Sequence, residues 1–292
     1  MEEEERELVL EKFRRMYGSR DIYVIYNTFL KEYGRKPLPN VPLEKRCIPY
    51  EDVYPLLYLK YRLVSSRIHK GIKHLIIDEM QDYSELQYRI IHEIFPCRMT
   101  ILGDRAQKME ASLEDVMEFL PGIFGKNIRK IVMNKSYRNT VEIAEYANRL
   151  AGINDVELFE RHGVPVEEKT VDSLARAAED IAGRLKIGEN DFETAAVILR
   201  TEKEAEQVWL LLKKELLKTD PEGKIKLHWM NRNSTRFNKG LTVTTYYLAK
   251  GLEFEQVFSV FPWGDTGELT MRGRYIAATR ALHELNAYLV KE

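Results

Sequence analysis

Residues 74–82 read HLIIDEMQD, an apolar run that leads directly into two adjacent carboxylates, Asp78 and Glu79. A short apolar run followed at once by acidic residues is typical of a buried strand whose C-terminal end carries polar groups. In open parallel sheets, ligands bind at that end of the strands. The stretch therefore predicts a parallel α/β sheet with acidic side chains at its ligand-binding edge.

A second segment has the same layout about 25 residues later. Residues 99–107 read MTILGDRAQ, in which an apolar run is followed by Gly103, Asp104 and Gln107. A glycine followed by an aspartate is common in turns and by itself indicates little. Two strands of one sheet that both end in an acid and a glutamine favour a shared site.

The remaining sequence alternates short apolar segments with segments of helical period, which favours parallel α/β sheets. The strands expected beyond these two segments are residues 128–133, 195–199, 224–229, 241–245, 256–261 and 287–290. The expected helices are residues 1–17, 50–63 (buried, and broken near Pro55), 84–94 (with Ser84 as N-cap), 140–150, 173–185, 202–217 and 274–285. A pause at residues 120–127 predicts a boundary between domains 1–125 and 126–292.

Composition excludes several classes of protein. The 45 basic and 46 acidic residues give a net charge of -1, unlike a protein that holds duplex DNA through a broad basic surface. The apolar runs are far shorter than the ~18 residues of a membrane span, and four glutamates after Met1 argue against a secretory signal. We expect no membrane association, and we expect Cys47 and Cys97 to be reduced thiols of a cytoplasmic protein.

The polar residues fit the needs of phosphoryl transfer to water. That reaction needs a carboxylate that helps to hold Mg²⁺ and a second group that positions or deprotonates the water. Asp78 and Glu79 can divide these roles because adjacent side chains on a strand point in different directions. Arg138 follows the strand at 128–133, and Arg280 is expected on a helix; an arginine that reaches a γ-phosphate stabilises charge that develops in the transition state.

Five motifs occur in the order DEMQD, GDRAQ, NKSYRNT, TTYYLAKGLEFEQVF and YIAATRALHEL. This ordered set resembles motifs II to VI of the UvrD/Rep-type superfamily-one DNA helicases, and the resemblance covers residues 70–292. Residues 49–63 and 72–88 also resemble the helicase IV/HelD branch, whose Gram-positive members act on RNA polymerase. The resemblance implies two RecA-like parallel-sheet domains of the P-loop NTPase type, the first of them incomplete.

The resemblance also implies roles for individual residues. Asp78 would hold Mg²⁺ through water, Glu79 would be the general base, and Gln107 would sense the γ-phosphate. Arg138 and Arg280 would reach that phosphate from the second domain. The residues implied in cofactor binding are Gln81, Asp104, Lys250, Gly251 and Glu253, and those implied in nucleic-acid binding are Thr245 and Tyr247.

The sequence departs from the family in one main respect. The family uses a G-x-x-x-x-G-K-[ST] loop to cradle the phosphates, and no such string occurs in the sequence; the pairs Gly125-Lys126 and Gly223-Lys224 lack its other residues. We therefore expect the chain to be the C-terminal part of a longer helicase. ATP and Mg²⁺ are expected only with the missing loop, supplied by an N-terminal half or a partner chain, and the isolated chain is expected to be inactive.

Two further departures concern the target. Tyr247 stands where the family usually has histidine, and Met109 lies where an aromatic residue usually stacks on a base. The implied partners are single-stranded or partly duplex DNA, with RNA polymerase as an additional target. Trp209, Trp229 and residues 231–239 are further candidates for a partner surface, although tryptophans with apolar flanks are more often core residues.

Two other functions stay open. The chain could be a non-catalytic RecA-like module that binds nucleic acid or RNA polymerase. A nuclease that uses Asp78, Glu79 and Asp82 as metal ligands is disfavoured, because nothing in the sequence marks additional ligands. A first sheet that lacks the phosphate-loop strand would expose an apolar edge, so we expect residues 1–70 to cover it in part or the chain to self-associate.

Overall fold

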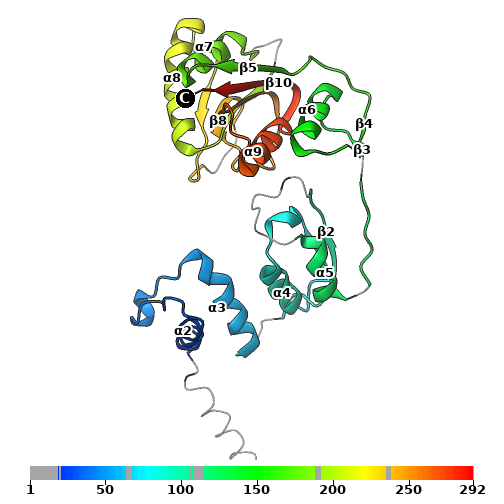
Figure 1. Cartoon of the computed structure of the whole chain (residues 1–292), viewed down its shortest axis with the longest axis vertical. Coiled ribbons are helices and arrows are strands. Elements are labelled where there is room, and N and C mark those ends of the chain that lie inside the picture. The colour runs from blue at the N-terminus through cyan, green and yellow to red at the C-terminus, as the bar shows by residue number, and fades with distance from the viewer. Residues whose placement is uncertain are drawn as a thin grey trace, which may run out of the picture. The chain divides into compact units, whose positions relative to one another are not determined.

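The computed structural model describes residues 19, 21–63, 68–104, 107, 115–125, 127–133, 135–154, 156–187, 192–234 and 238–291. The chain forms two compact units, which Figure 1 colours from blue to green and from green to red. The first unit comprises Met1–Gly103 and Leu113–Arg129, and the second comprises Asp104–Ser112 and Lys130–Glu292. The helix expected over residues 1–17 lies outside the described residues.

The first unit contains a small parallel sheet and helices. Its elements are α2 (Ile22–Glu32), η1 (Leu43–Lys45), α3 (Tyr50–Leu63), β1 (His74–Ile77), η2 (Met80–Asp82), α4 (Glu85–Ile94), β2 (Arg98–Ile101) and α5 (Val116–Phe124). Strands β1 and β2 pair in parallel, with His74 opposite Arg98 and Ile77 opposite Ile101. Ser84 caps α4 as predicted, in a reciprocal capping box with Gln87.

The sheet of the first unit is buried on one face. Ile77 is 5% exposed and packs with Tyr88 of α4 and with Phe119 of α5. The adjacent Ile76 points to the opposite face and is 67% exposed. The predicted buried strand is therefore buried on one face only, because no described helix covers the second face.

The helices of this unit also differ from the predictions. Helix α3 runs unbroken through Pro55, although a proline inside a helix removes one backbone hydrogen bond. Contacts on both sides of the proline hold the helix: Tyr26 donates to Asp52 at 2.6 Å, and Leu56 is buried against α2. Leu56 is the one buried residue of α3, so this helix is not the buried helix that was expected.

Helix α5 occupies part of the predicted pause at residues 120–127. It includes Pro121 and Gly122, and its apolar residues are buried against Tyr88. This burial outweighs the low helix propensity of proline and glycine. Helix α2 was not predicted at all.

The second unit is built on a six-stranded sheet of order β5-β10-β9-β6-β8-β7, in which all strands are parallel. Its elements are β3 (Lys135–Ser136), α6 (Val141–Ala151), β4 (Glu157–Leu158), β5 (Glu167–Val171), α7 (Leu174–Arg184), β6 (Thr194–Leu199), α8 (Glu202–Thr219), β7 (Leu227–Trp229), β8 (Gly240–Thr245), β9 (Phe254–Pro262), α9 (Glu268–Ala278) and β10 (Ala281–Val290). The predicted parallel α/β fold class is confirmed.

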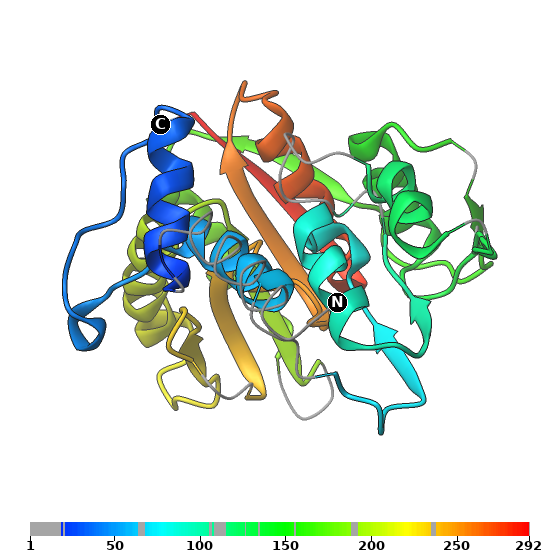
Figure 2. The same cartoon turned by 90° about the horizontal axis from the view of Figure 1, so that it is seen from below.

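Helices cover both faces of this sheet (Figures 1 and 2). Helices α7 and α8 pack on one face, in a cluster that includes Val197 of β6. Helices α6 and α9 pack on the other face, in a cluster that includes the adjacent Ile198. Both residues are fully buried, which explains why the central strands are continuous apolar runs rather than alternating ones.

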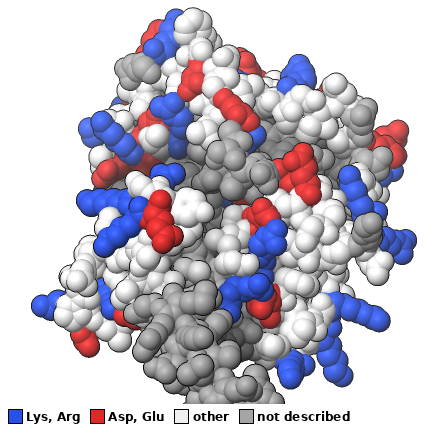
Figure 3. Space-filling model, turned by 60° about the horizontal axis from the view of Figure 1, so that its bottom comes forward, with Lys and Arg blue, Asp and Glu red and all other residues white. Residues whose placement is uncertain are grey.

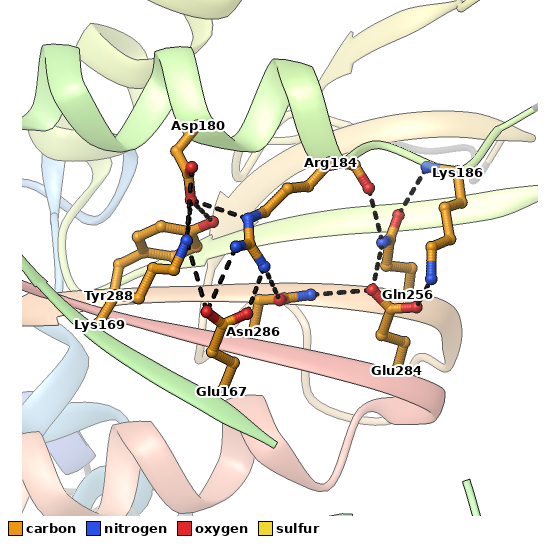
Figure 4. A network of polar contacts seen from close by, with 9 residues as sticks. All are labelled: Glu167, Lys169, Asp180, Arg184, Lys186, Gln256, Glu284, Asn286 and Tyr288. Atoms are coloured by element: carbon orange, nitrogen blue, oxygen red, sulfur yellow. Dashed lines mark hydrogen bonds and ion pairs between the residues drawn. The ribbon is translucent and has the colours of Figure 1, made fainter. Parts of the chain in front are cut away.

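A polar network fixes α7 to the sheet (Figure 4). Arg184 of α7 forms hydrogen bonds with Glu167 and Asn286 and an ion pair with Asp180 at 3.0 Å. Tyr288 donates to Asp180 at 2.7 Å. The network continues through Lys186, Gln256 and Glu284. These groups, which range from buried to exposed, satisfy one another's hydrogen bonds and set the position of α7.

Two predictions for the second half are wrong. Residues 128–133 form no strand; Ile131, Val132 and Met133 are 71%, 69% and 86% exposed. Sequence pattern alone cannot supply the neighbouring strand that an extended segment needs for its backbone hydrogen bonds.

The helix predicted over 274–285 is also displaced. Helix α9 ends at Ala278, and β10 begins at Ala281. In β10 Leu285 and Ala287 face one helical layer while Tyr288 faces the other, and pairing with β5 and β9 outweighs the local helical period.

Other expectations concern the thiols and membranes. Cys47 and Cys97 are both free thiols, as expected. Among the helices that the structure describes, none combines the length and apolarity of a membrane span.

Candidate functional site

The acidic turn after β1 is strained and tightly bonded. Asp78 accepts a hydrogen bond from the Glu79 backbone N–H at 2.8 Å, and Gln81 donates to the Glu79 carboxylate at 2.6 Å. Glu79 has φ 53° and ψ 49°, the one left-handed conformation among the described residues other than glycine. Such a backbone costs free energy, and residues of this kind cluster at functional sites.

The end of β2 holds this turn in place. The Met80 N–H donates to the Leu102 carbonyl at 2.8 Å, and the Leu102 N–H donates to Ile77 at 2.8 Å. A Cβ atom on Gly103 would lie 2.4 Å from Oε1 of Gln81, so only glycine allows this approach. The two predicted strand ends are therefore adjacent.

Asp104 and Gln107 belong to the second unit. Gln107 is 8% exposed and donates to Asp104 at 3.0 Å, and the Tyr275 hydroxyl donates to the same carboxylate oxygen at 3.1 Å. Burial and the neighbouring Asp104 raise the pKa of Tyr275 well above its usual value, so the hydroxyl stays a donor.

Arg280 lies in the turn between α9 and β10, not on the predicted helix. It is 1% exposed. Its guanidinium donates to Oε1 of Gln107 at 3.2 Å, to the carbonyls of Ile276 and Leu252 at 3.2 and 3.3 Å, and to the Thr279 hydroxyl at 3.1 Å. A buried charge is tolerated when hydrogen bonds compensate for the lost water.

The loop after β8 connects the candidate residues of the second unit. Lys250 donates to the Gln107 carbonyl at 3.4 Å, and Glu253 forms an ion pair with Arg138 at 2.7 Å. Gly251 between them has φ 80°, a conformation that glycine adopts at low cost. Arg138 and Glu253 are 47% and 42% exposed, so water can reach this pair.

The candidate nucleic-acid residues lie at the end of β8. Thr245 is 1% exposed, so its side chain faces the interior of the unit. The Tyr247 hydroxyl donates to Glu202 at 2.9 Å, and Arg232 lies 5.9 Å from the Tyr247 ring and 2.7 Å from Glu202. Tyr247 thus belongs to a polar and aromatic cluster at the surface.

The other candidate surface residues are less distinctive. The rings of Trp209 and Trp229 lie 5.8 Å apart, and Trp209 packs against the core of the second unit. On the face drawn in Figure 3, basic and acidic side chains are interspersed, in keeping with the net charge of -1.

The structure divides the predicted site between the units. Asp78, Glu79 and Gln81 lie together in the first unit, and the other candidates lie in the second. The second unit joins Asp104, Gln107, Lys250 and Arg280 in one network and pairs Arg138 with Glu253. Within the described ranges, no three His, Cys, Asp or Glu residues are arranged to hold a metal ion.

Two functional candidates were missed by the sequence analysis. Asn139 directly follows Arg138, and its amide donates to the carbonyls of Thr279 and Ala281, on either side of Arg280. Arg161 donates to the carbonyls of Arg138 and Leu282. Proximity to Arg138 was a usable signal for Asn139, whereas no sequence pattern marked Arg161.

The structure defines an α/β protein with parallel sheets, an acidic turn at a strand end of the first unit, and in the second unit a buried Arg280 and a surface pair of Arg138 with Glu253. Residues 12–109 match the family described as UvrD/REP helicase N-terminal domain. This part of the chain is therefore similar to the UvrD-like DNA helicases.

Individual relatives agree with this match. DNA helicase II of Haemophilus influenzae is 29% identical over 108 residues, which cover 35% of this chain and 14% of that protein. The ATP-dependent DNA helicase Rep of Buchnera aphidicola is 26% identical over 151 residues, 48% of this chain and 20% of that protein. The chain thus spans at most about a fifth of the length of these two relatives.

A solved structure is also similar to the chain. The C-terminal domain of a possible DNA helicase from Lactobacillus plantarum WCFS1 matches with a TM-score of 0.39 and 22% identity, over 53% of this chain and 88% of that one.

Proposed function

We propose that this chain is the C-terminal motor region of a DNA helicase-like ATPase, which couples ATP hydrolysis to movement on nucleic acid or to remodelling of RNA polymerase. The observation that carries the proposal is the bond between Gln107 and Arg280 at 3.2 Å. It joins two separate motifs of the ordered set in one buried contact. A motor needs such a link, because a phosphate-sensing residue must act on the group that moves.

The first-unit residues suit the hydrolytic step. Mg²⁺ neutralises charge on the phosphates and takes one or two protein carboxylates, with water and phosphate completing its shell. The exposed Asp78 carboxylate at a strand end fits that role. Glu79 would take the proton of the attacking water on its carboxylate, which the Gln81 amide orients.

The second-unit residues suit the stabilisation of phosphate charge. Arg138 pairs with the Glu253 carboxylate across 2.7 Å, the geometry that guanidinium also uses toward phosphate. Arg280 would complete the charge neutralisation, and Lys250, Gly251 and Asp104 shape the surrounding loop.

The proposal includes partners. A phosphate loop supplied by a separate stretch of polypeptide would complete the nucleotide site, since the sequence contains none. Tyr247 would contact single-stranded or partly duplex DNA, whereas the buried side chain of Thr245 is not available for such a contact. The likeness of residues 49–63 to the HelD branch supports RNA polymerase as a target and a cytoplasmic location.

The test is ATP binding and turnover by the purified chain with Mg²⁺ and single-stranded DNA. The variants are Glu79→Gln and, as a matched control on a nearby exposed acid, Glu85→Gln. The same assays are repeated with an added helicase fragment that carries a phosphate loop. We expect no turnover by the chain alone, and turnover with the fragment that Glu79→Gln abolishes and Glu85→Gln preserves.

The outcomes separate the two candidate functions. DNA or RNA polymerase binding without turnover under any condition would favour the non-catalytic module, for which the absence of the phosphate-loop string from the sequence is the specific observation. Turnover by the chain alone, abolished by Glu79→Gln, would show that it holds a phosphate cradle of another kind and would refute the dependence on added polypeptide.

A further inference from the structure

The backbone segments that carry Arg138 and Arg280 are joined by side chains that the proposed mechanism does not use. Asn139 is 8% exposed, and its Nδ2 donates to the Ala281 carbonyl at 2.6 Å and to the Thr279 carbonyl at 3.4 Å. These carbonyls flank Arg280 on both sides. One buried amide therefore fixes the turn from which Arg280 projects, and it does so from the residue next to Arg138.

Arg161 makes a second link between the same segments. Its Nη2 donates to the carbonyl of Arg138 itself and, at 2.9 Å, to the carbonyl of Leu282. The Arg161 guanidinium thus binds the backbone at Arg138 and the backbone two residues beyond Arg280. Two independent side chains, Asn139 and Arg161, therefore fix the distance between the backbone segments that carry Arg138 and Arg280.

Arg161 is itself held along residues 157–163, which we call the splint. Strand β4 pairs with β3 in parallel, and the Phe159 N–H donates to the Ser136 carbonyl at 3.0 Å. The Val141 N–H then donates to the Arg161 carbonyl at 2.9 Å. The splint thus runs beside the Arg138 segment on both sides of that residue.

The splint ends on the first turn of α6. Glu142 accepts from the Gly163 N–H at 2.9 Å and from His162 at 3.0 Å. A Cβ atom on Gly163 would lie 2.7 Å from the Thr140 side chain, so this position requires glycine. The guanidinium of Arg161 is therefore anchored at its own backbone before it reaches the two carbonyls.

Such support is useful where two side chains of like charge must bind one ligand. Arg138 and Arg280 carry like charges, and both can bind a single phosphate only if their spacing matches it. Rigid support reduces the free energy that ligand binding must otherwise spend on ordering them.

We propose that Asn139 and Arg161 are positioning residues that set the spacing of Arg138 and Arg280 for a phosphate group. The phosphate part of this inference rests on the proposed function. The positioning part concerns this unit alone and is tested separately.

The positioning part is tested by hydrogen exchange of the Arg280 Nε–H, which donates to the Ile276 carbonyl at 3.2 Å, in the full chain labelled with ¹⁵N-arginine. The variants are Arg161→Met, Arg161→Lys and Asn139→Leu, with Asn139→Ser in case leucine prevents folding. The matched control is Arg184→Met, which removes an arginine with several acceptors from the network of Figure 4.

We expect exchange to accelerate about tenfold or more in Arg161→Met and in the Asn139 variants, because local opening of the turn becomes easier. Arg161→Lys should restore protection, since an ammonium group can also donate to two carbonyls. Arg184→Met should lose global stability without this local change. Unchanged exchange in Arg161→Met, or equal acceleration in Arg184→Met, would refute the positioning role.

The phosphate part is tested by titration of the same variants with inorganic tripolyphosphate. Asn139→Leu changes no charge, so a fall in affinity of about three- to tenfold would report geometry alone. Arg161→Lys should bind as the unaltered chain does. If the unaltered chain binds no tripolyphosphate, either alone or with the added fragment that carries a phosphate loop, the proposed function fails at this site while the exchange result still decides the positioning role.

Discussion

Arg280 and Gln107 form a hydrogen bond of 3.2 Å between Nη2 and Oε1, and both side chains are more than nine-tenths buried. The contact links residues 173 positions apart within one unit. It ties Gln107 of the GDRAQ motif to the second unit, although Gly103, the first residue of that motif, closes the acidic turn of the first unit. The boundary between the units thus falls inside one motif.

Replacement of Arg280 should destabilise the second unit strongly. Arg280→Met removes the guanidinium donor from the Leu252 and Ile276 carbonyls and from the Gln107 amide oxygen, at a cost of about 2–4 kcal/mol. Urea unfolding followed by tryptophan fluorescence measures this, because all three tryptophans lie in the second unit. Arg176→Met, in a pair whose arginine is 66% exposed, should cost less than about 0.5 kcal/mol. Equal costs would contradict the buried role of Arg280.

Glu142 should contribute stability that acid removes. Burial alone would raise the pKa of its carboxyl, but hydrogen bonds from its own backbone N–H, His162 and Gly163 outweigh burial and lower the pKa from 4.5 to about 2. A depressed pKa in the folded state gives stability that is present above about pH 4.5 and is lost as the pH falls toward about 2.

The matching variant is Glu142→Gln. It should cost about 1 kcal/mol near neutral pH, a difference that shrinks below about pH 4.5. Urea unfolding over this pH range measures it, with Glu145→Gln on the same helix as the control. A difference between the chain and Glu142→Gln that does not change with pH would refute the interpretation.

The left-handed backbone of Glu79 should lower the stability of the turn when the residue at position 79 is not glycine. Glu79→Ala removes the carboxylate and keeps the strain at φ 53°, whereas Glu79→Gly removes both. The glycine variant should be more stable than the alanine variant by about 1 kcal/mol. Protection of the Leu102 amide, which bonds to Ile77 beside this turn, measures the difference by hydrogen exchange. If the alanine variant is the more protected of the two, the turn is not strained as described.

Gly103→Ala should open the acidic turn. The added methyl group would lie 2.4 Å from the Gln81 side chain and 2.6 Å from the Met80 nitrogen, so about 1–3 kcal/mol is lost. Gly122→Ala in α5 meets no atom within 4 Å and should stabilise the same unit by about 0.5–1 kcal/mol. Hydrogen exchange of the β1 and β2 amides distinguishes them, and equal effects would exclude a specific contact at Gly103.

The elements that sequence predicted well are those whose pattern and packing agree. Strand β6 is a continuous apolar run, helix α8 has a helical period, and Thr201 adds a capping box to α8. Residues 281–285 were predicted as helix because their local pattern fits one, whereas pairing with β9 makes them strand. Such pairing is non-local and is not encoded in the period of the segment itself.

The candidate site shows the same division. The ordered set of motifs was enough to identify Gln107, Arg138 and Arg280 as site candidates, because each lies in a recognisable motif. It could not show that Arg280 is buried in a turn or that Arg138 pairs with Glu253. The contribution of Arg161 depends on two backbone carbonyls, and carbonyls have no signature in sequence.

Strand β10 lies between β5 and β9 in the sheet, although it is the last of these strands along the sequence. Each neighbouring strand needs β10 to satisfy the backbone hydrogen bonds along one of its edges. The six-stranded sheet is therefore incomplete until residue 290 has been synthesised. During translation, the apolar strands β6 and β9 are synthesised before β10. Completion of this sheet therefore follows the synthesis of β10, and the newly made strands depend on protection from aggregation until then.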